Sequence, residues 1–73
     1  MSKLPQVSGA DVVRALLKLG FTVRRQHGSH IILRRDDPYA QTVVPNHRQI
    51  DRGTLRAILR QTEITPDKLI ELL

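Results

Sequence analysis

The sequence predicts an α+β protein with the element order α-β-β-β-α, followed by one more short helix. Helical periodicity comes first, three short β-rich runs joined by tight turns follow, and helical spacing returns over the last third of the 73 residues. Three strands with such short connections must form an antiparallel sheet, because a parallel pair needs a crossover of about a dozen residues. We therefore expect a small two-layer sandwich with helices on one face of a three-stranded sheet.

A first helix is predicted over residues 8–19. Its apolar residues fall within one arc: Val12, Val13, Leu16 and Leu17. Ser8 has the side chain of a helix N-cap, and Gly20 is placed to end the helix in a left-handed conformation. The residues before this helix lack such a pattern, so we expect 1–7 to be a flexible N-terminus and 8–73 to be a single domain.

The three β-rich runs are separated by turn signals. In the first, apolar Phe21 and Val23 alternate with polar residues as far as a turn at 27–28, which is the pattern of a half-buried strand. The second covers 31–35 and is closed by the turn sequence of 36–38, while the third covers 41–44 and ends at Pro45.

Alternation along the second run divides its side chains between two faces. The set that we assign to the core is Ile31, Leu33 and Arg35. The other set contains Ile32 and leaves His30 and Arg34 side by side on the open face of the sheet.

The two helices after the sheet differ in their surfaces. Over 51–61, the residues expected to be buried are Leu55, Ile58 and Leu59, and beside them at spacings of four lie Arg52, Arg56 and Arg60. The last helix has Thr65 as its predicted N-cap and Pro66 at its first position. Its predicted apolar face is Leu69, Ile70, Leu72 and Leu73.

Positive charge is concentrated in the middle of the chain. The 12 Lys and Arg exceed the 7 Asp and Glu by 5, and nine of these cations are Arg, whose planar guanidinium binds phosphate bidentately. Residues 24–60 hold eight Arg against three Asp, so this window alone carries +5. Nucleic acid is the leading partner, and an acidic protein is the alternative. An aromatic content of 3% argues against the base-stacking platform of single-strand binders.

Several functional classes are excluded by what the sequence lacks. Without cysteine there is no disulfide framework, zinc ribbon or thiol nucleophile, and a reducing cytoplasm fits this composition. The apolar runs are far shorter than the roughly 20 residues of a membrane span, so we expect a soluble protein without membrane contact. There is no P-loop, no G-x-G-x-x-G and no pair of catalytic carboxylates, which removes nucleotide hydrolysis and glycosidase chemistry.

Acid–base chemistry falls to the histidines, because imidazole is the side chain that titrates near neutral pH. His30 is the sharpest candidate, since it follows Gly28, where a glycine lets a backbone or a phosphate approach closely. The alternative for His30 is an exposed imidazole without a role. His47, in the loop after the third strand, is either solvated or a phosphate contact. Ser29 is a candidate donor to phosphate, but no arrangement of serine, base and acid can be assigned.

Two further patterns have to be weighed. His27 and His30 have an H-x-x-H spacing, but transition-metal sites use three or four ligands, and the nearby carboxylates of 36–37 belong to a separate turn. We therefore predict no metal and no other cofactor. The arginines of the second helix lack an acid four residues away within the helix. They are either a solvated face or a phosphate-binding surface together with the sheet arginines Arg24, Arg25, Arg34 and Arg35.

The string Gly28-Ser29-His30, after a strand that begins with Gly-Phe and ends with Arg-Gln, resembles the signature of the HicA family of toxins. The resemblance continues in Val-Pro-Asn-His at 44–47 and in residues 53–61, which are similar to the second-helix block of the family. Together the three blocks extend the resemblance over about residues 8–72, which is nearly the whole chain.

This resemblance implies a fold like that of a double-stranded-RNA-binding domain and an mRNA interferase, a small bacterial toxin that cleaves mRNA and stops translation. It also implies a HicB-type antitoxin that covers the active surface in a hetero-oligomer and helps to repress the operon. The catalytic histidine of the family maps onto His30. We expect the free toxin to be a monomer in the bacterial cytoplasm, released under stress.

For such a nuclease we expect a reaction that needs no metal, because RNA carries its own nucleophile in the 2′-OH. His30 is expected to take the 2′-OH proton or to protonate the leaving 5′-oxygen, with Ser29 orienting the phosphate. The other residues expected to contact phosphate are Gly28, Arg24, Arg34, Arg52, Arg56 and His47. The main alternative is a non-catalytic module that recognises structured RNA by shape, and a third possibility is a domain that docks an acidic protein.

Overall fold

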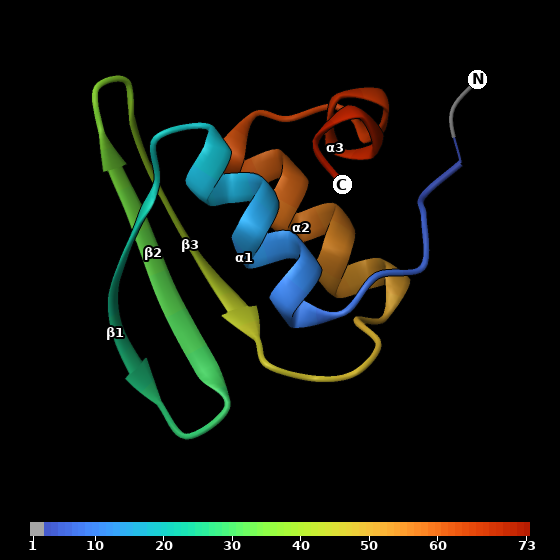
Figure 1. The fold of residues 1–73 in the computed structure, drawn as a ribbon, viewed down its shortest axis with the longest axis horizontal. Helices are drawn as coiled ribbons and strands as arrows, with labels where there is room; N and C mark the ends of the chain where they lie inside the picture. The colour runs from blue at the N-terminus through green and yellow to red at the C-terminus, as the bar shows by residue number, and fades with distance from the viewer. Residues whose placement is uncertain (1–2) are drawn as a thin grey trace.

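The protein is a two-layer sandwich of one sheet and a layer of helices. A computed structural model describes residues 3–73. Within them the elements are α1 (Gly9–Lys18), β1 (Thr22–His27), β2 (His30–Asp36), β3 (Tyr39–Pro45), α2 (Arg52–Thr62) and α3 (Pro66–Leu72). The strands pair antiparallel in the order β1-β2-β3, and the helices cover one face of the sheet (Figure 1). The predicted α+β fold class is thus confirmed.

Helix α1 begins and ends where its capping residues indicate. The Ser8 hydroxyl accepts the backbone N–H of Asp11 at 3.0 Å, and the Asp11 carboxylate accepts the N–H of Ser8 at 3.1 Å, which is a capping box. Inward from this cap, Val12 and Leu16 are buried. Gly20 then has a φ of +91°, the left-handed conformation that stops the helix.

The central strand alternates as predicted. Ile31 and Leu33 are buried against the helices, whereas His30 is exposed and Ile32 and Arg34 are partly exposed on the other face. Because β2 pairs with both neighbours, its alternation determines which side chains of β1 and β3 reach the open face.

The first strand departs from its expected pattern at Val23. This side chain stands opposite buried Leu33 in the ladder, yet it is 47% exposed, and every residue of β1 is exposed. The reason is the position of β1 at the sheet edge away from the helices, because α1 and α2 both pack against β3 (Figure 1). Alternation alone does not reveal which strand the helices leave uncovered.

The second and third helices also carry the predicted caps. The Asp51 carboxylate accepts the N–H of Thr54 at 3.2 Å, and the residues that α2 was predicted to bury are buried. Thr65 caps α3, with Pro66 at the first helical position. The predicted apolar face of α3 is too wide, since Leu69 is buried and Leu72 partly buried, but Ile70 and Leu73 are 47% and 52% exposed. A helix this short packs against α1 along one narrow line.

The core lies between the sheet and the helices. Its largest fully buried apolar side chains are Phe21, Leu16, Leu33, Leu55, Ile58 and Leu69. Val7 also belongs to the core, and its carbonyl accepts the N–H of Ile50 at 2.9 Å. Val7 lies in the segment expected to be a flexible N-terminus, of which residues 1–2 are outside the described residues. Among residues 3–73, none of the helices combines the length and apolarity of a membrane span.

Candidate functional site

The hairpin between β1 and β2 presents the signature histidine. His27 and His30 close a two-residue turn made by Gly28 and Ser29. Gly28 has a φ of +57°, a backbone conformation that glycine adopts without strain. A Cβ built on Gly28 would have no heavy atom within 4 Å outside its chain neighbours, so the turn is open to an approaching ligand.

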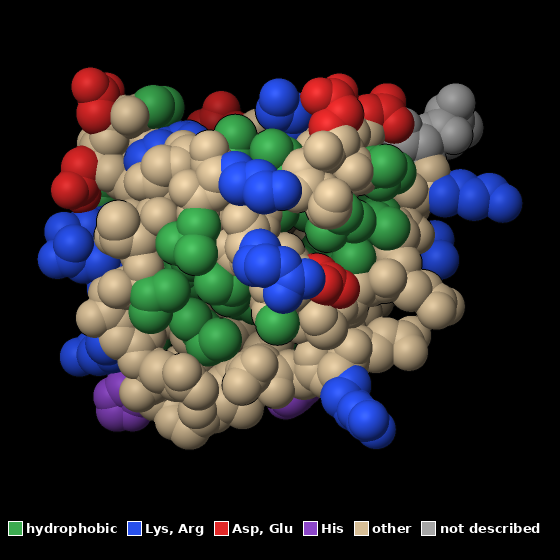
Figure 2. Space-filling model, viewed as in Figure 1, with side chains coloured by type: hydrophobic (Ala, Val, Ile, Leu, Met, Phe, Trp, Pro, Cys, Tyr) green, Lys and Arg blue, Asp and Glu red, His purple; other side chains and the backbone are tan. Residues whose placement is uncertain are grey.

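Backbone hydrogen bonds hold the loop after β3 against this turn. The N–H of Asn46 donates to the carbonyl of Ser29 at 2.6 Å, and the N–H of Gly9 donates to the carbonyl of His47 at 2.9 Å. The hairpin turn, the loop that carries His47 and the start of α1 therefore meet at one end of the sheet. Figure 2 shows histidine side chains along this end of the molecule. His27, His30 and His47 are all exposed.

The open face beside His30 carries a guanidinium, as alternation predicts. Arg34 lies four residues farther along β2, and its Nε stands 2.9 Å from Asp36 Oδ1. This contact is an ion pair without hydrogen-bond alignment, so Arg34 Nε remains without a hydrogen-bond partner. Because this Nε is buried, an incoming anion such as a phosphate would be bound by the terminal N–H groups of the guanidinium.

The cation that β1 adds to this face differs from the one expected. A register shift between Val23 and Arg25 places Arg25, not Arg24, opposite Ile32. Arg25 is therefore the β1 residue in line with the open-face side chains, while Arg24 is exposed at the irregularity. From the sequence, Arg25 was expected only as part of a general phosphate-binding surface, because no residue in β1 marks the extra position of a bulge.

The arginines of α2 form a separate basic surface. A groove on this surface is lined by Arg52, Arg56 and Arg60, together with Lys3, Leu4, Leu59 and Pro66. The opposite side of α2, which includes Ala57 and Gln61, faces β3. The structure therefore brings His30 and Ser29 to the sheet end and places Arg34 farther along the open face of β2. It places the α2 arginines on the helical layer. Among these three arginines, Arg52 is the nearest in sequence to the loop that carries His47.

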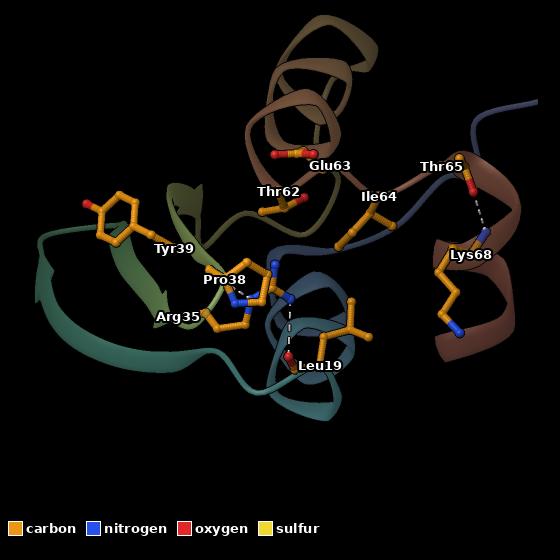
Figure 3. A pocket seen from close by; sticks show the side chains of 9 residues that line it. All are labelled: Leu19, Arg35, Pro38, Tyr39, Thr62, Glu63, Ile64, Thr65 and Lys68. Atoms are coloured by element: carbon orange, nitrogen blue, oxygen red, sulfur yellow. Dashed lines mark hydrogen bonds between the residues drawn. The ribbon is translucent and has the colours of Figure 1, made fainter.

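Arg35 has a structural role in the fold. Its guanidinium stacks 4.6 Å from the centre of the Phe21 ring, and it donates to the carbonyls of Pro38 at 2.9 Å and Leu19 at 3.3 Å. Figure 3 shows Arg35 among the residues that line the pocket between α1, the turn before β3 and the start of α3. Its donors are used inside the protein, so it differs in environment from Arg34.

Two carboxylates at helix caps have lowered pKa values. Hydrogen bonds from the backbone and hydroxyl of Ser8 lower the pKa of Asp11, and those from Thr54 lower the pKa of Asp51. Within residues 3–73, no three His, Asp or Glu side chains gather closely enough to hold a metal ion. The chemistry available at the sheet end is that of imidazole, hydroxyl and guanidinium groups.

Comparison with known proteins agrees with the motifs at this end. The family model described as the HicA toxin of bacterial toxin–antitoxin systems matches residues 9–64, from the start of α1 to the connection after α2. No curated protein matches the chain. The match covers well over half of the 73 residues and includes the Gly28-Ser29-His30 turn. The chain therefore belongs to the HicA family of toxins.

Proposed function

We propose that this toxin is an endoribonuclease, an mRNA interferase that cuts mRNA and inhibits translation with His30 as its acid–base residue. The observation that carries the proposal is the placement of His30, exposed beside an open glycine turn and on the same sheet face as Arg34. An exposed imidazole on a sheet face that also carries guanidinium groups is suited to proton transfer at a phosphodiester.

The chemistry requires little more than this end of the sheet. An RNA 2′-oxygen attacks the adjacent phosphorus, the bond from phosphorus to the 5′-oxygen breaks, and charge develops on the non-bridging oxygens. His30 takes the 2′-OH proton or protonates the leaving oxygen, and Arg34, farther along the same face, binds a phosphate of the RNA. Ser29 donates to the phosphate, and the open space at Gly28 admits it.

Phosphates next to the cut in the same RNA chain contact the rest of the basic surface. His47 lies in the loop bonded to the turn, and Arg24 in the exposed first strand. Arg52 and Arg56 continue the surface onto the helical layer, where they bind phosphates at a distance from the cut. These contacts position the RNA by its backbone and carry no base recognition.

A toxin of a toxin–antitoxin family has an antitoxin partner. We propose that this partner is a HicB-type protein that covers His30 and presents acidic or polar groups to the arginines, in the bacterial cytoplasm. The toxin alone is then a monomer, which binds either RNA or antitoxin with the sheet end. Addition of the antitoxin is expected to stop RNA cleavage, and continued cleavage in the assembled complex would contradict occlusion of His30.

Cleavage of a defined single-stranded RNA in excess EDTA tests the activity. We compare the unsubstituted protein with His30→Ala and with Glu71→Gln, a control on the exposed surface of α3. Cleavage by the first and third proteins but not by His30→Ala supports a ribonuclease that depends on this histidine and needs no metal. Full activity of His30→Ala refutes the mechanism. Intact RNA in all lanes with a retained gel shift favours a module that only binds RNA.

A further inference from the structure

A second imidazole stands directly across the hairpin from His30. The ladder between β1 and β2 pairs His27 with His30, immediately at the two-residue turn. Side chains at opposite positions of an antiparallel pair project from the same face, with Cβ atoms about 4.5–5.5 Å apart. His27 and His30 are both exposed, so the structure presents two neighbouring imidazoles to solvent on the open face.

Two imidazoles solve a difficulty of the single-histidine reaction. The attacking 2′-oxygen and the leaving 5′-oxygen lie on opposite sides of phosphorus, and one oxygen loses a proton while the other gains one. A lone imidazole must serve both oxygens in turn, whereas a neutral and a protonated imidazole on either side of one phosphate serve them together. The cross-strand spacing of His27 and His30 allows a phosphate to be placed between them.

We propose that His27 is the second proton-transfer group of the ribonuclease, forming with His30 an acid–base pair across one phosphodiester. The neutral member of the pair takes the 2′-OH proton as the 2′-oxygen bonds to phosphorus. The protonated member gives its proton to the 5′-oxygen as that bond breaks. The products are a 2′,3′-cyclic phosphate and a 5′-hydroxyl end, and the two imidazoles exchange protonation states. The inference rests on the proposed ribonuclease activity.

The surroundings of the pair favour an anion. Arg34 and Arg25 follow along the same face on β2 and β1, and the loop after β3 contributes His47 and Arg48. The acid of this face on β2 is Asp36, at the far end of the strand and in contact with Arg34. A phosphate between the imidazoles therefore meets mainly positive groups.

A substrate with a sulfur leaving group separates the two roles. RNA in which the bridging 5′-oxygen is replaced by sulfur needs no protonation of its leaving group, so it bypasses the general acid. We compare His27→Gln, His30→Gln and the double variant on normal and 5′-thio RNA in EDTA. Each single variant is expected to cut normal RNA about 10²-fold or more slowly. Only the variant that lacks the acid is expected to regain its rate on 5′-thio RNA.

The pH dependence of kcat/KM provides the readout that a structural role would not change. A pair with one neutral and one protonated member gives a bell-shaped profile, and loss of one imidazole removes one limb. His27→Gln with the rate and bell-shaped profile of the unsubstituted protein overturns the pair, while the ribonuclease proposal stands. Equal slowing of His27→Gln on both substrates with both limbs retained also overturns it, as a purely structural effect. No cleavage by the unsubstituted protein refutes the ribonuclease and the pair together.

Discussion

Two glycines in the first turns of helices provide a matched test of how the loop after β3 is held. Gly9 is the first residue of α1, and Gly53 is the second of α2. A Cβ at Gly9 would stand 2.2 Å from the carbonyl oxygen of Pro45 and 3.0 Å from the Cα of Asn46. At Gly53, the nearest atom to such a Cβ is a carboxylate oxygen of Asp51, at an ordinary 3.5 Å. The same added methyl group therefore meets rigid backbone in one helix and an ordinary side-chain contact in the other.

The size of the effect follows from these distances. Cβ contacts under 3.0 Å essentially do not occur, so Gly9→Ala must move the Pro45 carbonyl by at least 3.0 − 2.2 = 0.8 Å. The 2.2 Å approach to backbone puts the cost in the upper part of the range for overpacking, about 2–3 kcal/mol, and alanine in a helix recovers about 0.5–1 kcal/mol relative to glycine. We expect a net loss of about 1–2 kcal/mol, which lowers Tm by roughly 4–16 °C in a domain of this size. Gly53→Ala keeps only the favourable contribution, and its Tm is expected to rise by a few degrees.

The assay is thermal and urea unfolding of the three proteins, followed by far-UV circular dichroism. Opposite shifts of Tm for Gly9→Ala and Gly53→Ala are the expected result. A Gly9→Ala protein as stable as the unsubstituted one would refute close packing of α1 on the Pro45 backbone. A loss of equal size at Gly53 would show that the first turn of any helix in this protein resists a side chain, whatever it contacts.

Three further predictions concern charge and packing. Hydrogen bonds from Thr54 lower the pKa of Asp51 below its ordinary 3.8. The carboxylate therefore stabilises the fold above pH 3.8, and this stabilisation is lost as the pH falls through the lowered pKa. Asp51→Asn should show a smaller drop in Tm between about pH 7 and acid, and an unchanged drop would contradict this. Arg35→Lys loses the planar stacking on Phe21 and should lower the free energy of unfolding by about 0.5–2 kcal/mol in urea titrations; equal stability would argue against the stacking. Leu33→Ala removes a fully buried side chain and should lower the free energy of unfolding by about 2–5 kcal/mol, measured as a lower urea midpoint. A loss under about 1 kcal/mol would place Leu33 outside the core.

Local features of the fold were predictable because their causes lie within a few residues. Ser8, Asp51 and Thr65 each cap a helix through a backbone N–H three residues ahead. Gly20 ends α1 through its own left-handed conformation. The strand order followed from connections too short for any parallel crossover. Each of these inferences depends only on the identity and spacing of residues along the chain, and both can be read from the sequence.

The wrong predictions of burial concern residues whose exposure depends on which other elements pack over them. Val23 has the alternation of a half-buried side chain, but the helices leave its strand uncovered. Ile70 and Leu73 belong to the apolar side of α3, but the helix reaches the core mainly through Leu69. Periodicity describes which residues share a face, and only packing decides how much of that face is covered.

The sequence by itself determined the family, the element order and the choice of His30 as the residue to test, because the signature, periods and caps are written in neighbouring residues. Only the tertiary structure decided which groups meet. It bonded the His47 loop to the turn at Ser29, replaced Arg24 by Arg25 in the open-face register and separated the α2 arginines from the sheet end. It also set His27 opposite His30. Such pairings depend on register and on hydrogen bonds between distant segments, and both are established only when the whole chain packs.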